Sequence, residues 1–325
     1  MSLHPLHFPV MLAEVIAALA PKDGEIHVDG TFGAGGYTRA LLEQAKCRVI
    51  AIDRDPTAVA RGEEMAKSWD GRLTMVHGCF GSMASTLKTI GIERVNGIAL
   101  DIGVSSMQID QPERGFSFAK DGPLDMRMAC EGDSAADVVN NADESQLANI
   151  IYHYGEERHS RRVARAIVER RKQSPFATTA DLADTVRSVV PKSKDGIDPA
   201  TRTFQALRIA VNDELGELER GLGDAEHMLE DGGRLAVVTF HSLEDRMVKD
   251  FLKSRSGGQS QPSRHIPMAM GKEDAPTFRA ISRKPIVASP EEVRINPRSR
   301  SAHLRAAIRT NAPALSSPTS LGGLS

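Results

Sequence analysis

One stretch near the N-terminus constrains the fold more than any other. Residues 26–29 form a short strand-like run that ends in Asp29, and a helical pattern begins near Tyr37. Between them lies a turn with three closely spaced glycines, Gly33, Gly35 and Gly36. Such glycines let the backbone bend tightly and leave no side chain between it and a ligand. The stretch therefore predicts a nucleoside-cofactor site on an α/β sheet.

The alternation of strand and helix patterns continues through the first hundred residues and predicts a parallel sheet. Ligands of such sheets bind beyond the carboxyl ends of the strands. Four successive strand-like runs carry a polar or aromatic residue at that end, namely Asp29, Asp53, Phe80 and Asp101. Asp53 follows Gly33 by about 20 residues, a suitable spacing for a carboxylate that hydrogen-bonds ribose hydroxyls.

The alternation stops after the fourth strand, and helical patterns take its place until a strongly apolar run at 234–240. This order indicates a discontinuous α/β domain, residues 1–104 and 211–310, with a helical domain inserted at 105–210. We expect the last two strands of the sheet at 281–288 and 303–308.

Two segments have the composition of irregular chain. Residues 254–276 are rich in Ser, Gly, Pro and Gln and predict a flexible excursion, and residues 311–325 have the composition of a disordered tail.

The overall composition sets limits on the class of protein. The chain has 325 residues, 26% charged and 40% hydrophobic, and a net charge of −2. It has no apolar run of the ~20 residues that a membrane span needs, and no signal-peptide pattern. The three cysteines form no CxxC pair. We expect a reduced cytoplasmic protein with no membrane association, zinc site or disulfide framework.

A nucleic-acid partner would have to bind a local basic surface, because the net charge is slightly negative. Residues 156–172 predict an amphipathic helix whose polar side carries four arginines, Arg158, Arg161, Arg162 and Arg165. Arginine suits bidentate phosphate contact, so these residues are candidates for RNA binding. The alternative is an ordinary solvated helix surface.

The glycine turn also narrows the choice of cofactor. A dinucleotide fingerprint needs a further glycine three residues after Gly35, and this chain lacks it. Asp29 at the end of the first strand would repel a diphosphate but would suit a cationic ammonium or sulfonium. S-adenosylmethionine offers those groups, a ribose for Asp53 and an adenine for Phe80. We therefore prefer S-adenosylmethionine to a nicotinamide dinucleotide.

Nine motifs, in the same order, resemble the signatures of the bacterial MraW family, also called the ribosomal small-subunit methyltransferase H family. They cover the chain from His7 to about Thr310: Asp29–Gly36, Ile52–Pro56, Leu100–Ser106, Glu113–Phe118, Asp121–Met128, Tyr154–Arg158, Ala200–Gln205, Thr239–Arg246 and Asn296–Arg300. The resemblance implies a Rossmann-like class I S-adenosylmethionine-dependent methyltransferase sheet with an inserted all-helical domain.

The resemblance also implies an activity and a set of contacts. The reaction would be methylation of the exocyclic N4 of a decoding-centre cytidine in 16S rRNA, either as free rRNA or within the small ribosomal subunit. Its cofactor contacts would be Gly35, Gly36, Tyr37, Asp53, Phe80, Asp101 and Gln108. The family often has histidine in place of Tyr37, which leaves any side-chain role there in doubt.

The chemistry requires an acceptor for an amine hydrogen, because the N4 lone pair is delocalised into the ring and is a poor nucleophile. Asp101 is the natural candidate, although the resemblance favours a cofactor contact for it; Asp125 and His241 are further candidates. The target base could stack on Phe116 or Phe118, or these rings could be core residues. No cysteine has the setting that methylation at C5 would require.

Two other functions stay open at this point. The chain could methylate another RNA or a substrate other than nucleic acid, or it could be a non-catalytic RNA-binding assembly factor. The sequence does not decide between a monomer and a homodimer.

Overall fold

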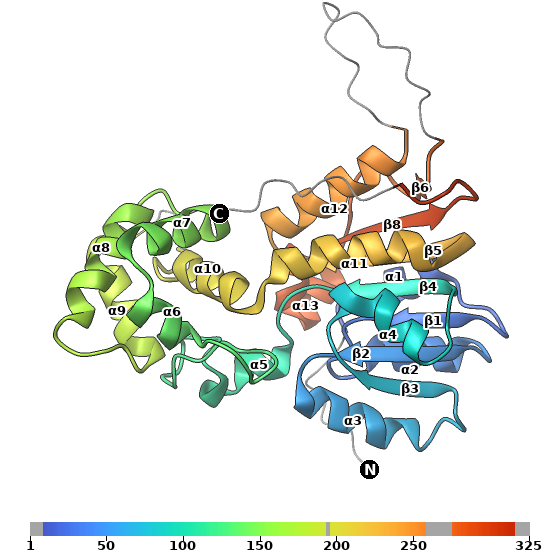
Figure 1. Ribbon diagram of the computed structural model, residues 1–325, viewed down its shortest axis with the longest axis horizontal. Coiled ribbons are helices and arrows are strands. Elements are labelled where there is room, and N and C mark those ends of the chain that lie inside the picture. The colour runs from blue at the N-terminus through green and yellow to red at the C-terminus, as the bar shows by residue number, and fades with distance from the viewer. Residues whose placement is uncertain (1–8, 193–195, 258–274, 316–325) are drawn as a thin grey trace, which may run out of the picture. The chain divides into compact units, whose positions relative to one another are not determined.

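The computed structural model describes residues 9–192, 196–257 and 275–315 (Figure 1). The chain divides into two compact units, Met1–Gly103 with Gly216–Ser325, and Val104–Leu215. The first unit has two hydrophobic cores, one on each face of its sheet, and the second unit has one. No helix in the described ranges combines the length and the apolar character that a bilayer crossing requires.

The first unit is built on an eight-stranded sheet in the order β3-β2-β1-β4-β5-β8-β6, with β7 paired to β8. β1 to β5 pair in parallel, whereas β6 and β7 pair with β8 antiparallel, as does β5. The strands are β1 (Ile26–Asp29), β2 (Arg48–Asp53), β3 (Leu73–His77), β4 (Val95–Asp101), β5 (Leu229–Thr239), β6 (Phe278–Ala280), β7 (Ile286–Val287) and β8 (His303–Arg309). The strand order reverses between β1 and β4, which is where open α/β sheets bind ligands.

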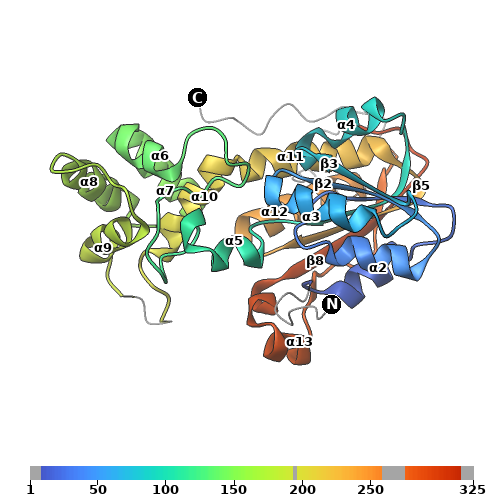
Figure 2. The same ribbon diagram turned by 90° about the horizontal axis from the view of Figure 1, so that it is seen from below.

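Helices cover both faces of this sheet (Figures 1 and 2). The helices of the unit are α1 (Leu12–Leu19), α2 (Gly36–Gln44), α3 (Pro56–Ala66), α4 (Met83–Thr89), α11 (Glu214–Met228), α12 (Ser242–Arg255) and α13 (Pro290–Ile295), with 3₁₀ turns η1 (Phe80–Ser82) and η3 (Pro297–Ser301). One core packs α4, α11 and α12 against the sheet, and the other packs α1, α2 and α3. Alternate residues of each central strand enter the two cores, for example Ile50 and Ala51 of β2.

The second unit is helical, apart from an isolated β-bridge between Pro123 and Thr178. Its elements are α5 (Ser106–Asp110), η2 (Pro112–Arg114), α6 (Ala135–Asn141), α7 (Glu144–Gly155), α8 (Ser160–Arg171), α9 (Thr179–Val189) and α10 (Thr201–Asn212). Its core joins α6 to α10 and includes Leu147, Ile167 and Phe204. The predicted fold class, a Rossmann-like α/β sheet with a helical insertion, is confirmed.

The prediction for the end of the sheet was wrong in detail. The run at 281–288 is not one strand: β6 ends at Ala280, before it, and only Ile286 and Val287 within it pair, as β7. Most of this run is exposed, so no buried face enforces a continuous strand. β5 also begins earlier than expected, at Leu229, with a register irregularity before Arg234.

Two predicted irregular segments fall partly outside the described residues. Residues 258–274 of the predicted excursion and residues 316–325 of the predicted tail are not described. The start of the tail packs on the first unit: Ala312 is buried, and Leu315 N donates to Glu226 Oε1 at 3.3 Å.

Candidate active site

The glycine turn between β1 and α2 has the geometry that the sequence required. Gly33 and Gly35 have φ values of +53° and +77°, and Gly35 is the N-cap of α2 without a capping side chain. The backbone N–H groups of Gly36 and Tyr37 donate no hydrogen bond within the described residues. The turn therefore presents two N–H donors that a ligand could use.

Gly35 is also sterically constrained. A Cβ atom there would lie 2.7 Å from the Phe32 ring, whereas a Cβ at Gly24, with a similar φ of +82°, would have nothing within 4 Å. We expect Gly24→Ala to cost about 1 kcal/mol through backbone strain alone, and Gly35→Ala to cost about 2–4 kcal/mol and to weaken cofactor binding. Chemical denaturation and a cofactor titration measure both effects. Equal losses in the two variants would show that the Phe32 contact does not matter.

The Tyr37 side chain does not face a ligand. Its ring is buried, and its hydroxyl donates to the Val10 carbonyl at 2.5 Å. Burial, followed by repulsion from Asp101 and Asp29, raises the pKa of this phenol well above its ordinary value. Any cofactor contact at this position would therefore use the backbone N–H, which makes the departure from the family's usual histidine harmless to that contact.

Asp29 caps the helix that follows it. Its Oδ2 accepts hydrogen bonds from the Thr38 hydroxyl at 2.6 Å and the Thr38 N–H at 3.2 Å, and its Oδ1 accepts from Thr31 N at 3.3 Å. Burial raises the pKa of Asp29 to about 6, partly offset by these hydrogen bonds. The sequence expectation that Asp29 would face a cation misses this capping role.

Asp53 joins two turns at the carboxyl edge of the sheet. Its Oδ2 accepts from Gly33 N at 2.7 Å and its Oδ1 accepts from Asp55 N at 2.8 Å. Burial raises its pKa. The carboxylate thus lies directly beside the glycine turn, the position expected of a ribose ligand.

Asp101 at the end of β4 has an unsatisfied carboxylate oxygen. Oδ1 is buried and has no hydrogen-bond partner among the described residues, while the backbone N–H of Asp101 donates to the Thr31 hydroxyl at 2.7 Å. Burial, followed by repulsion from Asp29 and then Glu244, raises the pKa of Asp101 to about 8. None of the three carboxylates, Asp29, Asp53 and Asp101, forms an ion pair within the described residues. Such an arrangement is suited to a cationic ligand, because a buried charge needs a counter-charge.

His241 and Glu244 lie at the end of β5. His241 is the N-cap of α12, and its Nε2 lies 2.9 Å from Glu244 Oε1. The fully buried Glu244 accepts hydrogen bonds through Oε2 from Phe240 N at 2.9 Å and His241 N at 3.3 Å. α12 begins at Ser242, and Glu244 in its first turn holds the imidazole of His241 in position.

Phe80 is half-buried in the first unit, at the start of η1. A Cβ at Gly221 of α11 would lie 2.5 Å from the Phe80 ring, so this glycine is what allows the ring to pack on the helix. Phe80 also packs against the core that joins α4, α11 and α12. One side of the ring therefore has a structural role.

Two predicted site residues of the second unit are committed to structural contacts. Gln108 is buried and forms the capping box of α5, with its Oε1 accepting from Ser105 N at 2.9 Å. Asp125 forms a bidentate ion pair with Arg127, at 3.0 Å to Nε and 2.6 Å to Nη2. These contacts hold the pKa of Asp125 below its ordinary value against the opposing effect of burial, which makes it a poor proton acceptor.

Phe116 and Phe118 pack against the core of the second unit, and Phe118 meets Phe204 edge-on with ring centroids 4.7 Å apart. Arg187 stacks over Phe118 at 5.4 Å. These contacts favour the core interpretation of both rings over the base-stacking one.

Asn212 organises the loop that contains Asp125, a role that the sequence did not reveal. It is buried, its Oδ1 accepts from Met128 N at 2.8 Å, and its Nδ2 donates to the Met126 carbonyl at 2.7 Å. Met126 has a φ of +62°, a strained conformation that such bonds stabilise.

Because Asn212→Ala would leave two buried backbone groups without partners, we expect it to destabilise the second unit by about 2–4 kcal/mol. The exposed Asn141 at the end of α6 provides a matched control, since Asn141→Ala removes no side-chain hydrogen bond. Limited proteolysis of the loop and urea unfolding measure the effect. Equal stability of the two variants would contradict the bracing role of Asn212.

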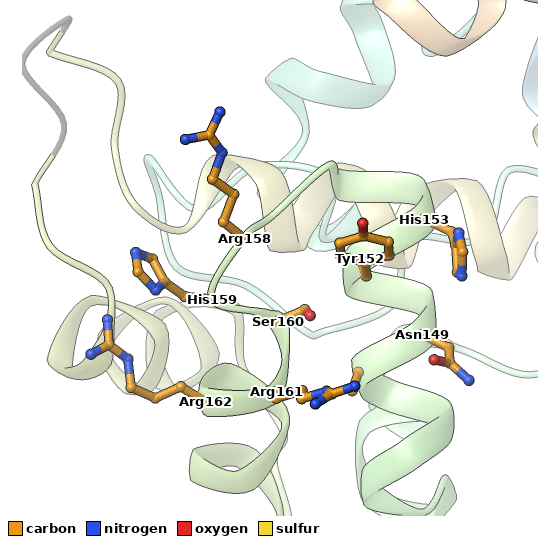
Figure 3. Close-up of a pocket in the computed structure, with 9 residues that line it drawn as sticks. Asn149, Tyr152, His153, Arg158, His159, Ser160, Arg161 and Arg162 are labelled. Carbon is orange, nitrogen blue, oxygen red and sulfur yellow. The ribbon is translucent and has the colours of Figure 1, made fainter.

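The four predicted RNA-binding arginines are all exposed at or near α8 of the second unit. Arg165 lies 3.5 Å from the carboxylate of Glu144. The others, Arg158, Arg161 and Arg162, line a surface cavity together with residues of α7 (Figure 3).

Comparison with known proteins gives a consistent result. A family model described as the MraW methylase family matches residues 4–310. A Paramagnetospirillum magneticum protein named ribosomal RNA small subunit methyltransferase H is 67% identical over 308 residues, which cover 95% of this chain and 97% of the relative. Proteins of the same name from Rhodospirillum centenum and Rhodospirillum rubrum are 66% and 61% identical, over 95% of this chain and 94% and 95% of theirs.

Proposed function

We infer that this chain, which belongs to the MraW methylase family, is a methyltransferase of small-subunit ribosomal RNA. The finer proposal is that it uses S-adenosylmethionine to methylate the exocyclic N4 of a decoding-centre cytidine in 16S rRNA, in the cytoplasm. The names and near full-length identity of the relatives support the substrate class. The motifs that resemble the signatures of the family support the proposed target atom, N4 of the decoding-centre cytidine.

The single observation that carries the cofactor proposal is the buried, unpartnered oxygen of Asp101. It belongs to a group of carboxylates that no cation neutralises within the described part of the chain, beside a turn with two available N–H donors. S-adenosylmethionine carries an ammonium group and a sulfonium group, and when bound it supplies an electrophilic methyl group. The residues that would hold it are Gly33, Gly35, Gly36, Tyr37 through its backbone, Asp53, Phe80 and Asp101.

Asp101 and His241 are the residues of the first unit best suited to the amine. Both lie at carboxyl ends of strands, and each has a buried polar atom that forms no hydrogen bond with the described part of the chain. Either could accept a hydrogen bond from the N4 amine. This hydrogen bond would favour a tetrahedral geometry at N4 and stabilise the positive charge that develops on N4 during methyl transfer. Glu244 keeps the imidazole of His241 oriented. Asp125 is the weaker candidate because Arg127 already occupies its carboxylate.

The role of Gln108 in cofactor binding remains a proposal from the family motif alone. Its Oε1 accepts a hydrogen bond in the capping box of α5.

The proposal is tested by nucleoside mass spectrometry of 16S rRNA from cells that lack the gene. N4-methylcytidine should be absent, and the purified protein with S-adenosylmethionine should restore it on small subunits from those cells. Complementation with Asp101→Asn should not restore it. Failure of the purified protein to add the modification, to either subunits or free rRNA, would overturn the proposal and favour another substrate or a non-catalytic role.

A further inference from the structure

A cavity of about 690 Å³ lies in the second unit, where α7 is joined to α8 (Figure 3). Its volume is in the range of small-molecule sites. Its lining includes three arginines, two histidines and one tyrosine. The lining residues are Ala148, Asn149, Tyr152, His153, Arg158, His159, Ser160, Arg161 and Arg162. It contains no carboxylate.

The three arginines of the cavity are available to a ligand. Arg158, Arg161 and Arg162 are exposed, and none forms an ion pair within the described residues. Other arginines of the same helix are committed: Arg170 pairs with Asp181 at 2.5 Å, and Arg171 donates to the Val139 and Ala142 carbonyls. The unpaired cations are therefore concentrated at the N-terminal end of α8.

That end of α8 also presents unsatisfied donors. His159, the N-cap, provides no capping side chain, and the N–H of Arg161 has no acceptor among the described residues. Ser160 is only 5% exposed, and its hydroxyl forms no hydrogen bond with another of the described residues. In Figure 3 this hydroxyl points into the space between α7 and α8. A helix N-terminus with free N–H and O–H donors and nearby arginines suits a phosphate.

The cavity offers an aromatic surface as well. Tyr152 of α7 is 56% exposed, and its ring meets His153 edge-on with centroids 5.1 Å apart. An exposed tyrosine beside arginines is a stacking platform of the kind that binds unpaired bases. In Figure 3, Arg161 extends toward α7 and Asn149, whereas Arg158, His159 and Arg162 lie on the other side of the α7–α8 connection.

We propose that this cavity binds one nucleotide of the RNA substrate that flanks the methylated cytidine, with a phosphate at the N-terminus of α8 and the base stacked on Tyr152. The base held here is not the methylated one, because the proposed partners of the methylated base, Asp101 and His241, belong to the first unit and do not line this cavity. An acidic peptide would use the arginines but would leave the exposed ring unused. That this RNA is small-subunit ribosomal RNA rests on the proposed function.

The test uses the full chain and a short, fluorescently labelled single-stranded RNA, with binding followed by anisotropy at several salt concentrations. Arg161→Glu with Arg162→Glu should weaken binding and reduce the magnitude of the salt slope by about 0.7, the contribution of one phosphate contact on a single strand. Tyr152→Ala should weaken binding roughly 5- to 100-fold, and Tyr152→Phe should retain it. Ser160→Ala should weaken binding with no loss of folding.

Lys172→Glu is the matched control, because Lys172 lies at the other end of α8, outside the cavity, and pairs with Glu169. It should leave RNA affinity unchanged. S-adenosylmethionine affinity should be the same in all variants. In the variants expected to lose RNA affinity, the KM for small subunits should rise more than kcat falls.

Unchanged RNA affinity in the arginine variant, or equal losses in Tyr152→Ala and Tyr152→Phe, would overturn the proposal. So would a polyglutamate peptide that competes as well as RNA does. If the wild type binds this RNA through the cavity but methylates no ribosomal RNA, the proposed function fails and the nucleotide site stands.

Discussion

Replacing Asp101 by asparagine should lower the rate of methyl transfer by about 10²–10³-fold and weaken the binding of S-adenosylmethionine. The amide has the shape of the carboxylate, but it cannot carry the negative charge that stabilises a cation in a site with little water. Across residues 9–192, 196–257 and 275–315, no hydrogen-bond partner of Asp101 Oδ1 would compensate for this loss. A filter-binding assay with labelled cofactor measures the rate, and calorimetry measures the affinity.

A matched control is Asp70→Asn. Asp70 is exposed and has a φ of +47°, a conformation that asparagine adopts as readily as aspartate. This variant should keep wild-type activity and stability. An Asp101→Asn enzyme with near wild-type turnover and cofactor affinity would show that the negative charge of Asp101 is needed neither for the reaction nor as the counter-charge of the cofactor.

The sequence predicted the central sheet because buried parallel strands leave a strong local signal. The apolar runs that end in Asp29, Asp53 and Asp101 became β1, β2 and β4, with those residues at one edge. Positive φ values at Gly33 and Gly35 were equally predictable, since few other residues tolerate that conformation. β6 and β7 are short and mostly exposed, and such strands leave little pattern to detect.

Side-chain roles were harder to predict than positions. Whether Asp29 faces a ligand or caps α2 depends on Thr38, which the turn brings beside it. Tyr37 is fixed by the carbonyl of Val10, 27 residues earlier. Asn212 braces residues more than 80 positions away. Such pairings follow from tertiary packing, and a single sequence does not encode them in any local pattern.

Asp125 is a second case in which the sequence did not reveal the role of a side chain. Its motif looked like a catalytic signature, but the carboxylate pairs with Arg127, two residues later, and helps to shape a loop in which Met126 has a positive φ. A strongly patterned motif can therefore specify backbone geometry as well as chemistry. Asp29, Asp53 and Asp101 differ from Asp125 in one respect, which is that no ion pair in the described residues neutralises them.

This lack of a counter-charge makes cofactor binding dependent on pH. In the ligand-free protein the pKa of Asp101 is about 8 and that of Asp29 about 6, so Asp101 is largely protonated at pH 6. A cationic ligand favours the ionised carboxylate, and its affinity must rise as pH increases toward 8. We expect S-adenosylmethionine to bind up to roughly 50-fold more tightly at pH 8 than at pH 6, with a plateau above that.

Proton linkage gives this expectation a direct signature. Binding at pH 7 should release a proton, which calorimetry detects as a heat that changes with the ionisation enthalpy of the buffer. Asp101→Asn should release less and should flatten the dependence of affinity on pH. Proton uptake on binding, or an affinity that falls from pH 6 to pH 8, would contradict the proposed counter-charge.

The stability of the ligand-free protein should depend on pH in the opposite direction. Because the folded pKa of Asp101 is raised from 3.8 to about 8, the folded state binds more protons than the unfolded chain between these values. The contribution of Asp101 to stability is therefore full at low pH and is lost as pH rises toward 8. The cofactor should consequently raise the melting temperature more at pH 8 than at pH 6, and Asp101→Asn should remove most of that difference.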